Sequence, residues 1–227
     1  MRTARVLLTA LLLVSSLGHA QPPASSPDPG DRFAVAYVET RADAAAAGRA
    51  ALERYRDAVR SQTGCLGVEL FEQGGRRGRF AVVESWRDAA MFDARDSMAK
   101  KVLLEALRPI RVSDYDERPY KSLTLDSRAA AGGGVAVISH VDVAPNTPAP
   151  DLLRRLAETS RGEPGNVRFV VLQHLQRGNH FTVVEQWRSD AALDEHVAAE
   201  HTREYRDALQ PLTGSPLDER VYTPLAR

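Results

Sequence analysis

The chain has 227 residues, enough for one large domain or for two domains of roughly 100 residues each. Its 30 basic and 30 acidic residues balance, which argues against a protein that binds nucleic acid through a basic surface. Hydrophobic residues make up 43% and charged residues 26% of the chain, as in soluble globular proteins, and the single cysteine, Cys65, excludes an internal disulfide, a cysteine-rich zinc site and an iron–sulfur cluster.

The N-terminal segment has the pattern of a cleaved export signal. Arg2 and Arg5 precede the apolar run Val6–Leu17, and Gly18 and Ala20 are the small residues expected before a cleavage site. The alternative is an uncleaved anchor, but this run is shorter than the roughly 18–20 apolar residues that cross a bilayer. Residues 1–20 are therefore predicted to be a signal peptide, and the mature protein to be exported, periplasmic or secreted, with no membrane span after cleavage.

A short tether follows the predicted signal. Residues 21–31 (QPPASSPDPGD) are rich in proline, serine and aspartate and show no apolar periodicity. This composition predicts a flexible segment outside any folded core.

The rest of the chain contains an internal repeat. The segment Phe80–Arg87 (FAVVESWR) reappears 101 positions later as Phe181–Arg188 (FTVVEQWR), with six of eight residues identical. A second pair of matching segments, DERPYKSL and DERVYTPL, lies 102 positions apart. The two copies are Arg32–Leu123 and Gly134–Leu225, and the Gly/Ala-rich segment Thr124–Gly133 suits a linker between them.

Both copies predict the same order of elements from apolar periodicity and turn residues. The first copy predicts a strand, a helix, two strands, a helix and a strand at Phe33–Val38, Ala44–Ser61, Leu66–Phe71, Arg79–Ser85, Asp88–Leu107 and around Tyr120. The second copy predicts them at Val135–Val141, Asp151–Ser160, Val167–Leu172, His180–Trp187, Asp190–Leu209 and around Tyr222.

This order, β-α-β-β-α-β, is the ferredoxin-like arrangement of an antiparallel sheet with both helices on one face. The strands are mostly apolar on both faces, so the face without helices also needs covering. We therefore predict an α+β protein in which two tandem ferredoxin-like repeats pack sheet to sheet as a pseudo-dimeric α/β barrel within one chain. The chain is expected to be a monomeric pseudo-dimer or to form a further homodimer.

One run in the second copy carries a family resemblance. Its spacing is E-x-W-x(8)-H-x(4)-H-x(3)-Y, formed by Glu185, Trp187, His196, His201 and Tyr205. The run resembles the signature of antibiotic biosynthesis monooxygenase domains, especially their quinol monooxygenase branch, in the dimeric α/β-barrel superfamily. The resemblance covers both repeats.

The resemblance implies an enzyme that oxygenates a small electron-rich aromatic substrate, such as a quinol, with molecular oxygen and with no metal or organic cofactor. Two alternatives stay open, because fold alone does not choose the chemistry. One is a barrel that binds or degrades haem. The other is a non-catalytic protein of the cell envelope that binds a small ligand.

The first copy departs from this signature. It has Arg95, Lys100 and Leu104 where the second copy has its two histidines and its tyrosine, although Glu84 and Trp86 persist. The second repeat is therefore predicted to hold the functional site and the first mainly to complete the barrel, unless the first has a different site of its own.

His196, Tyr205 and His140 are the predicted catalytic residues. His196 is expected near the start of a helix as a base or hydrogen-bond partner, because an imidazole titrates near neutral pH, or else to pack as an amphipathic side chain. Tyr205 is expected to orient the substrate by donating a hydrogen bond, or else to be an interfacial tyrosine. His140 shares a strand face with Ala136 and Ile138, where a polar side chain needs a partner or a cavity.

Trp187, His201 and Asn166 are the predicted substrate-binding residues. Trp187 would form a pocket wall or fill the core, and Asn166 would supply a pocket amide or form a turn. In one continuous helix, five residues place His201 roughly 140° from His196, so both imidazoles should not reach one pocket. A two-histidine metal site is disfavoured for the same reason, and no metal is expected.

Overall fold

The computed structural model describes residues 31–124, 126 and 133–226. The predicted signal peptide, nearly all of the tether and most of the linker lie outside the described residues. Export and the exact domain limits therefore stay predictions. No helix among the described residues is long and apolar enough to cross a membrane.

The described elements follow the predicted order in both repeats. The first repeat contains β1 (Arg32–Glu39), the 3-10 helix η1 (Ala42–Ala44), α1 (Ala45–Arg60), β2 (Cys65–Gln73), β3 (Arg79–Trp86), α2 (Ala89–Asp93), α3 (Ser97–Leu107) and β4 (Asp116–Thr124). The second contains β5 (Val135–Asp142), α4 (Ala149–Ser160), β6 (Asn166–His174), β7 (His180–Trp187), α5 (Asp190–Ala198), α6 (Glu200–Leu209), the 3-10 helix η2 (Gln210–Leu212) and β8 (Asp218–Pro224).

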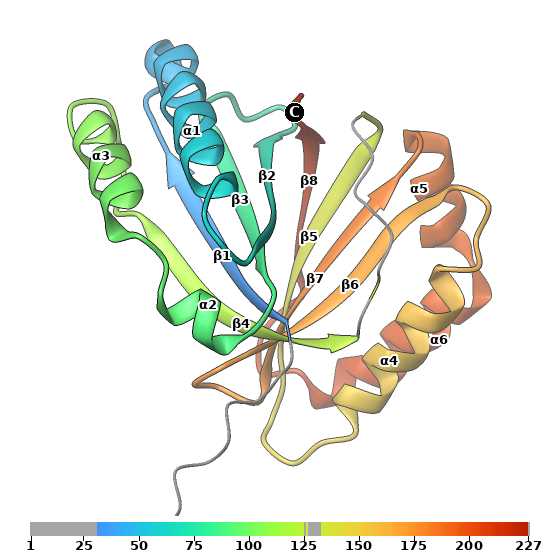
Figure 1. Ribbon diagram of the computed structural model, residues 1–227. Coiled ribbons are helices and arrows are strands. Elements are labelled where there is room, and N and C mark those ends of the chain that lie inside the picture. Colours follow the sequence, from blue (N-terminus) through green and yellow to red (C-terminus); the bar gives the residue numbers. More distant parts are fainter. Residues whose placement is uncertain (1–30, 125, 127–132, 227) are drawn as a thin grey trace, which may run out of the picture.

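The strands form one closed barrel in the order β1-β3-β2-β8-β5-β7-β6-β4. Two antiparallel contacts join the repeats, β2 with β8 and β4 with β6. The helices of the first repeat cover one side of the barrel and those of the second repeat cover the other (Figure 1). The predicted α+β tandem barrel is confirmed, and the pairing at both sheet edges leaves none of the described strands with an unpaired edge.

Alternate side chains of the strands face two compartments. Residues such as Phe33, Ile138 and Tyr222 fill the barrel interior, where both repeats contribute. The opposite faces pack against the helices of their own repeat, and there Trp86 and Trp187 are 1% and 0% exposed. Each strand face is therefore covered, one by the helices and the other by the barrel interior, and this explains why the strands are apolar on both faces, as predicted.

A charged group links the repeats inside the barrel. Arg168 on β6 forms an ion pair with Glu69 on β2, and Gln186 Nε2 on β7 donates a hydrogen bond to Glu69 Oε1 at 2.7 Å. Arg168 and Gln186 are 8% and 1% exposed. One carboxylate of the first repeat thus contacts two buried polar side chains of the second.

The second helix of each repeat is broken where the sequence predicted a continuous helix. In the second repeat α5 ends at Ala198, and Ala199 has an extended backbone with φ −63° and ψ 146° before α6 begins. His196 therefore lies in the last turn of α5, and the expectation that it lies near a helix start is wrong. The break changes the direction of the chain between the two histidines of the signature.

His140 lies on the inward face of β5, as the strand alternation predicts. Its Nδ1 is 3.1 Å from Thr182 Oγ1, which donates a hydrogen bond to the Tyr120 hydroxyl, and its ring meets the edge of Tyr37. Burial, aided by the nearby Arg118 guanidinium, lowers the pKa of His140 to about 4. The neutral imidazole is thus a hydrogen-bonded part of the barrel interior.

This depressed pKa predicts a loss of stability in acid. An unfolded histidine takes up a proton near pH 6.5, whereas folded His140 does so only near pH 4, so stability falls as pH drops through this window. The full loss is about 3 kcal/mol below pH 4. We expect His140→Phe to lose less stability than the wild type between pH 7 and pH 4 in urea unfolding. Parallel pH curves for the two proteins would contradict the assignment.

Candidate active site

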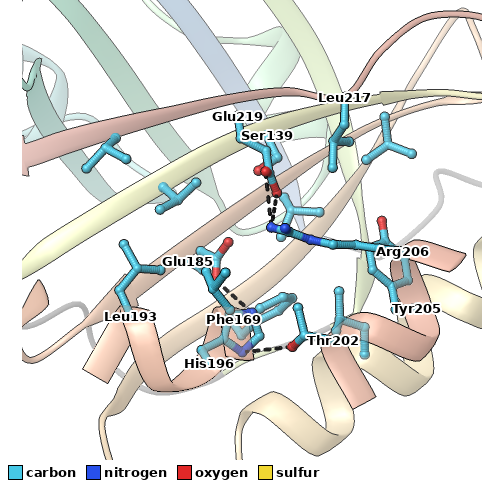
Figure 2. A pocket seen from close by; sticks show the side chains of 16 residues that line it. Ser139, Phe169, Glu185, Leu193, His196, Thr202, Tyr205, Arg206, Leu217 and Glu219 are labelled. Atoms are coloured by element: carbon cyan, nitrogen blue, oxygen red, sulfur yellow. Dashed lines mark hydrogen bonds and ion pairs between the residues drawn. The ribbon is translucent and has the colours of Figure 1, made fainter. Parts of the chain in front are cut away.

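A pocket lies between the outward face of the second repeat's strands and helices α4, α5 and α6 (Figure 2). Its volume is about 110 Å³. Nine apolar side chains form most of its wall: Val137, Val141, Leu156, Phe169, Val183, Leu193, Val197, Leu217 and Val221. The polar lining residues are Ser139, Glu185, His196, Thr202, Tyr205, Arg206 and Glu219. Its lining, apolar with a few convergent polar groups, is typical of a small-molecule site, whereas its volume is below the usual range of about 300–1,000 Å³.

His196 is held from three sides. Its Nδ1 is 2.7 Å from Glu163 Oε1, and its ring stacks on the indole of Trp187 with the ring centres 4.4 Å apart. Its Nε2 is 3.5 Å from Glu185 Oε2, on the side of the pocket (Figure 2). A carboxylate only accepts hydrogen bonds, so the partner at Glu163 assigns the proton to Nδ1 and leaves the lone pair on Nε2.

The charge state of His196 suits a proton acceptor. Burial lowers the pKa of the imidazole, although the hydrogen bond and charge of Glu163 act in the opposite direction. The ring is 4% exposed. At neutral pH the imidazole is therefore mostly neutral, and the nitrogen that faces the pocket is free to take a proton.

Glu185 stands beside this nitrogen at the end of β7. Its Oε2 accepts a hydrogen bond of 2.8 Å from Trp187 Nε1. Burial, with smaller contributions from Glu219 and Glu163, raises the pKa of Glu185 to about 8. At pH 7 most molecules therefore carry a protonated Glu185, a proton donor next to a proton acceptor.

The remaining polar groups come from α6 and β8. Arg206 Nη2 lies 3.1 Å from both carboxylate oxygens of Glu219, and both side chains are more than a third exposed. Tyr205 lines the pocket beside them, and burial raises its pKa, so it remains a neutral phenol. Solvent therefore reaches the ion pair, whereas Tyr205 is only 8% exposed.

The six predicted site residues have different places in the structure. His196 and Tyr205 line the pocket. Trp187 is fully buried and supports His196 from behind instead of forming a wall. Asn166 is buried at the start of β6, where its side chain points to the Arg168 carbonyl, and His140 lies inside the barrel. The structure thus brings together only two of the six at the pocket surface.

His196 lines the pocket and His201 does not, as the helical spacing predicted, but the two imidazoles meet at one carboxylate. His201 Nε2 is 3.0 Å from the same Glu163 Oε1 that His196 contacts. The extended backbone of Ala199 replaces the helical rotation on which the prediction depended. One donor atom from each of Glu163, His196 and His201 lies within 4.8 Å of the others, so among residues 31–124, 126 and 133–226 these three could hold a metal ion.

Glu163 and Glu185 are the functional candidates that were not singled out from the sequence. The sequence could have indicated Glu185, since the E-x-W spacing is present in both repeats. No sequence pattern indicated Glu163, because it lies in the turn after α4, 33 residues before its partner His196.

The equivalent place in the first repeat has different chemistry. Trp86 Nε1 donates to Glu84 Oε2 at 3.0 Å, as in the second repeat, but Arg95 lies 3.8 Å from this oxygen where the second repeat has an imidazole. Arg95 and Lys100 also pair with Glu117. An arginine cannot accept a proton, so the acid–base pair is confined to the second repeat.

The sequence pattern of one protein family, described as antibiotic biosynthesis monooxygenase, matches residues 32–99 and 149–208. The chain belongs to the antibiotic biosynthesis monooxygenase family. The two matched segments fall in the two repeats, so the predicted resemblance is confirmed. Membership supports monooxygenase-like chemistry on a small molecule and leaves the substrate open.

Solved structures of similar tandem architecture support the fold of this family member. A candidate monooxygenase from Fusobacterium nucleatum has a TM-score of 0.76 and 16% identity, over 87% of this chain and 93% of that one. An anthrone oxidase-like protein has a TM-score of 0.65 and 16% identity, over 88% and 92%. An uncharacterised protein of Synechocystis, sll1783, is 26% identical over 137 residues, 60% of this chain and 92% of its own length.

Proposed function

We propose that the pocket of the second repeat is the active site of a cofactor-independent monooxygenase that acts on a one-ring quinol or a similar phenol. The observation that carries this proposal is the position of His196 Nε2, which lies 3.5 Å from the Glu185 carboxyl at the pocket wall. Both face an apolar space that an aromatic ring can fill.

The proposed reaction begins with proton transfer from a substrate hydroxyl to His196 Nε2. The resulting phenolate is electron-rich enough to reduce molecular oxygen, and a ring carbon then forms a bond to oxygen. The O–O bond breaks as Glu185 donates its proton to the departing oxygen, the ring carbon loses its hydrogen to the same oxygen to form water, and His196 then returns its proton to Glu185. A quinol and O₂ thus give a hydroxyquinone and water: the ring supplies four electrons, one oxygen atom stays on it, and two hydrogens of the quinol leave in the water.

The surroundings favour these steps. Glu163 holds the imidazole so that its acceptor nitrogen faces the pocket. The aspartate of a Ser-His-Asp triad orients the histidine base in the same way. The apolar walls strengthen electrostatic interactions in the site. Tyr205, a neutral phenol at the pocket edge, is placed to donate a hydrogen bond to a substrate oxygen.

The pocket volume argues for one ring. A cavity of about 150 Å³ holds a benzene molecule in other proteins, and this pocket has about 110 Å³, so even one ring requires side chains at the pocket edge to move apart. A three-ring anthrone is too large unless the pocket rearranges. We therefore do not propose anthrone as the substrate of this protein, although one similar structure is of an anthrone oxidase-like protein. Haem, which is larger still, is not favoured, and a purely ligand-binding barrel does not account for the acid–base pair.

Oxygen uptake with a panel of hydroquinones and anthrone tests this proposal. We expect protein-dependent uptake of one O₂ per one-ring quinol and one labelled oxygen atom in the product from ¹⁸O₂. The rate with anthrone should be at most roughly one tenth of the rate with the one-ring quinol. Reactions without protein measure autoxidation. If the whole panel is oxidised no faster than without protein, the proposed activity is wrong, and faster turnover of anthrone would overturn the size limit.

A further inference from the structure

We infer that Glu163, His196 and His201 form a binding site for a divalent transition metal ion, with Zn²⁺ as the model ion, on the far side of His196 from the pocket. Two imidazoles and one carboxylate are a common ligand set of zinc sites with an open coordination position. The same donors also suit other divalent ions of the first transition row.

The donor atoms already face a common point. His196 Nδ1 and His201 Nε2 lie 2.7 Å and 3.0 Å from Glu163 Oε1, and one donor from each residue lies within 4.8 Å of the others. In a tetrahedral zinc site with bonds of about 2.0–2.2 Å, neighbouring donors are roughly 3.3 Å apart. Shifts of about 1 Å in side chains are therefore enough to admit the ion.

The backbone supplies these ligands from three separate segments. Glu163 lies in the turn between α4 and β6, His196 in the last turn of α5, and His201 in the first turn of α6. The extended residue Ala199 between the two helices lets histidines five positions apart converge. The three segments form a small cluster at the surface of the second repeat.

The surroundings of the cluster meet two further requirements of a metal site. A metal-binding histidine usually has its second nitrogen next to a carboxylate, and His196 Nε2 is 3.5 Å from Glu185 Oε2. Glu163 and His201 are 18% and 23% exposed in their side chains, so solvent can provide the remaining ligand and the ion can enter. His196 itself is fixed by its stack on Trp187.

The alternative interpretation is a hydrogen-bonded group that only stabilises the helix break. The first repeat bears on this, because it has Gln62, Arg95 and Lys100 at the equivalent positions and forms the same half-barrel. There the two cationic side chains are bonded to Glu117. The Glu–His–His group is thus not required by the architecture, which favours a ligand-binding role in the second repeat.

Metal binding would also act on the pocket, and this step rests on the proposed function. An ion at Nδ1 of His196 leaves the ring proton on Nε2, so the nitrogen that faces the pocket becomes a donor to Glu185. The proton acceptor is then lost. The metal-free protein is therefore the active form, and Zn²⁺ inhibits it.

Metal titration of the chelator-treated, tag-free protein tests the site. We expect one Co²⁺ per chain, with the visible absorption of a tetrahedral N/O site, displaced by one equivalent of Zn²⁺ in calorimetry. Glu163→Gln, which introduces the residue type of the first repeat, and His201→Asn are each expected to weaken Zn²⁺ binding by roughly 100-fold or more.

The control removes two histidines on the opposite ends of strands β6 and β7. His174→Asn with His180→Asn should leave Zn²⁺ binding unchanged, and circular dichroism shows whether each variant is folded. No saturable binding, or binding that Glu163→Gln and His201→Asn leave unchanged in folded protein, would overturn the metal site. Because binding is measured without turnover, Zn²⁺ binding in a protein that oxidises no quinol would refute the proposed function alone.

Discussion

Replacing His196 with alanine is expected to lower kcat for quinol oxidation by about 10²–10⁴-fold, the usual contribution of a positioned general base. The variant keeps Glu163 and Glu185 but has no group that can take the substrate proton into the apolar pocket. Oxygen uptake at saturating quinol, corrected for autoxidation, measures the effect. Added imidazole should restore part of the rate, because it can occupy the space left by the side chain.

The matched control for this variant is Arg95→Ala, at the equivalent position of the first repeat. It removes a partly buried side chain that also contacts a buried glutamate, but it touches no acid–base pair. The rate of Arg95→Ala should match the wild type. Equal rates for wild type and His196→Ala, in protein with an unchanged fold, would show that His196 is not the base.

Replacing Glu69 with alanine is expected to destabilise the fold by about 3–5 kcal/mol. The substitution leaves the guanidinium of Arg168 and the amide of Gln186 inside the barrel without the carboxylate that both contact. Urea unfolding of the variant and the wild type measures the difference. The double variant Glu69→Leu with Arg168→Met should recover most of the lost stability, since it removes both charges together.

Glu72→Ala provides the comparison on the same strand. Glu72 is as buried as Glu69, but its partner Arg49 is 46% exposed, and an ion pair that solvent reaches in this way contributes about 0–1 kcal/mol. A loss at Glu69 no larger than the loss at Glu72 would mean that the interior ion pair does not hold the two repeats together.

The sequence was sufficient to predict the fold because each helix and strand had its own local pattern, and the two repeats showed these patterns in the same order. Apolar runs bounded by turn residues marked most of the strands, and the second copy gave the same order of elements independently. The shared E-x-W spacing also marked the ends of β3 and β7, where Glu84 and Glu185 are both buried against the helices. Closure of the barrel through β2–β8 and β4–β6 follows from packing between elements distant in sequence, which no local pattern encodes.

The site was predictable only in part for the same reason. His196 and Tyr205 were recognisable by residue type and spacing, but their geometry depends on a helix break at Ala199, and alanine is a strong helix former that gives no sign of a break. Glu163 meets His196 only through tertiary structure. His140 was placed on the correct strand face, but its surroundings were set by residues of the other repeat, such as Tyr37 and Tyr120.

The contacts of β2 with β8 and of β4 with β6 lie within one chain. A barrel assembled from two separate subunits comes apart on dilution, because association depends on protein concentration. Here the covalent connection keeps each half at a high effective concentration around the other. The pocket, whose wall includes β8 and the barrel strands beside it, is therefore expected to persist at any protein abundance.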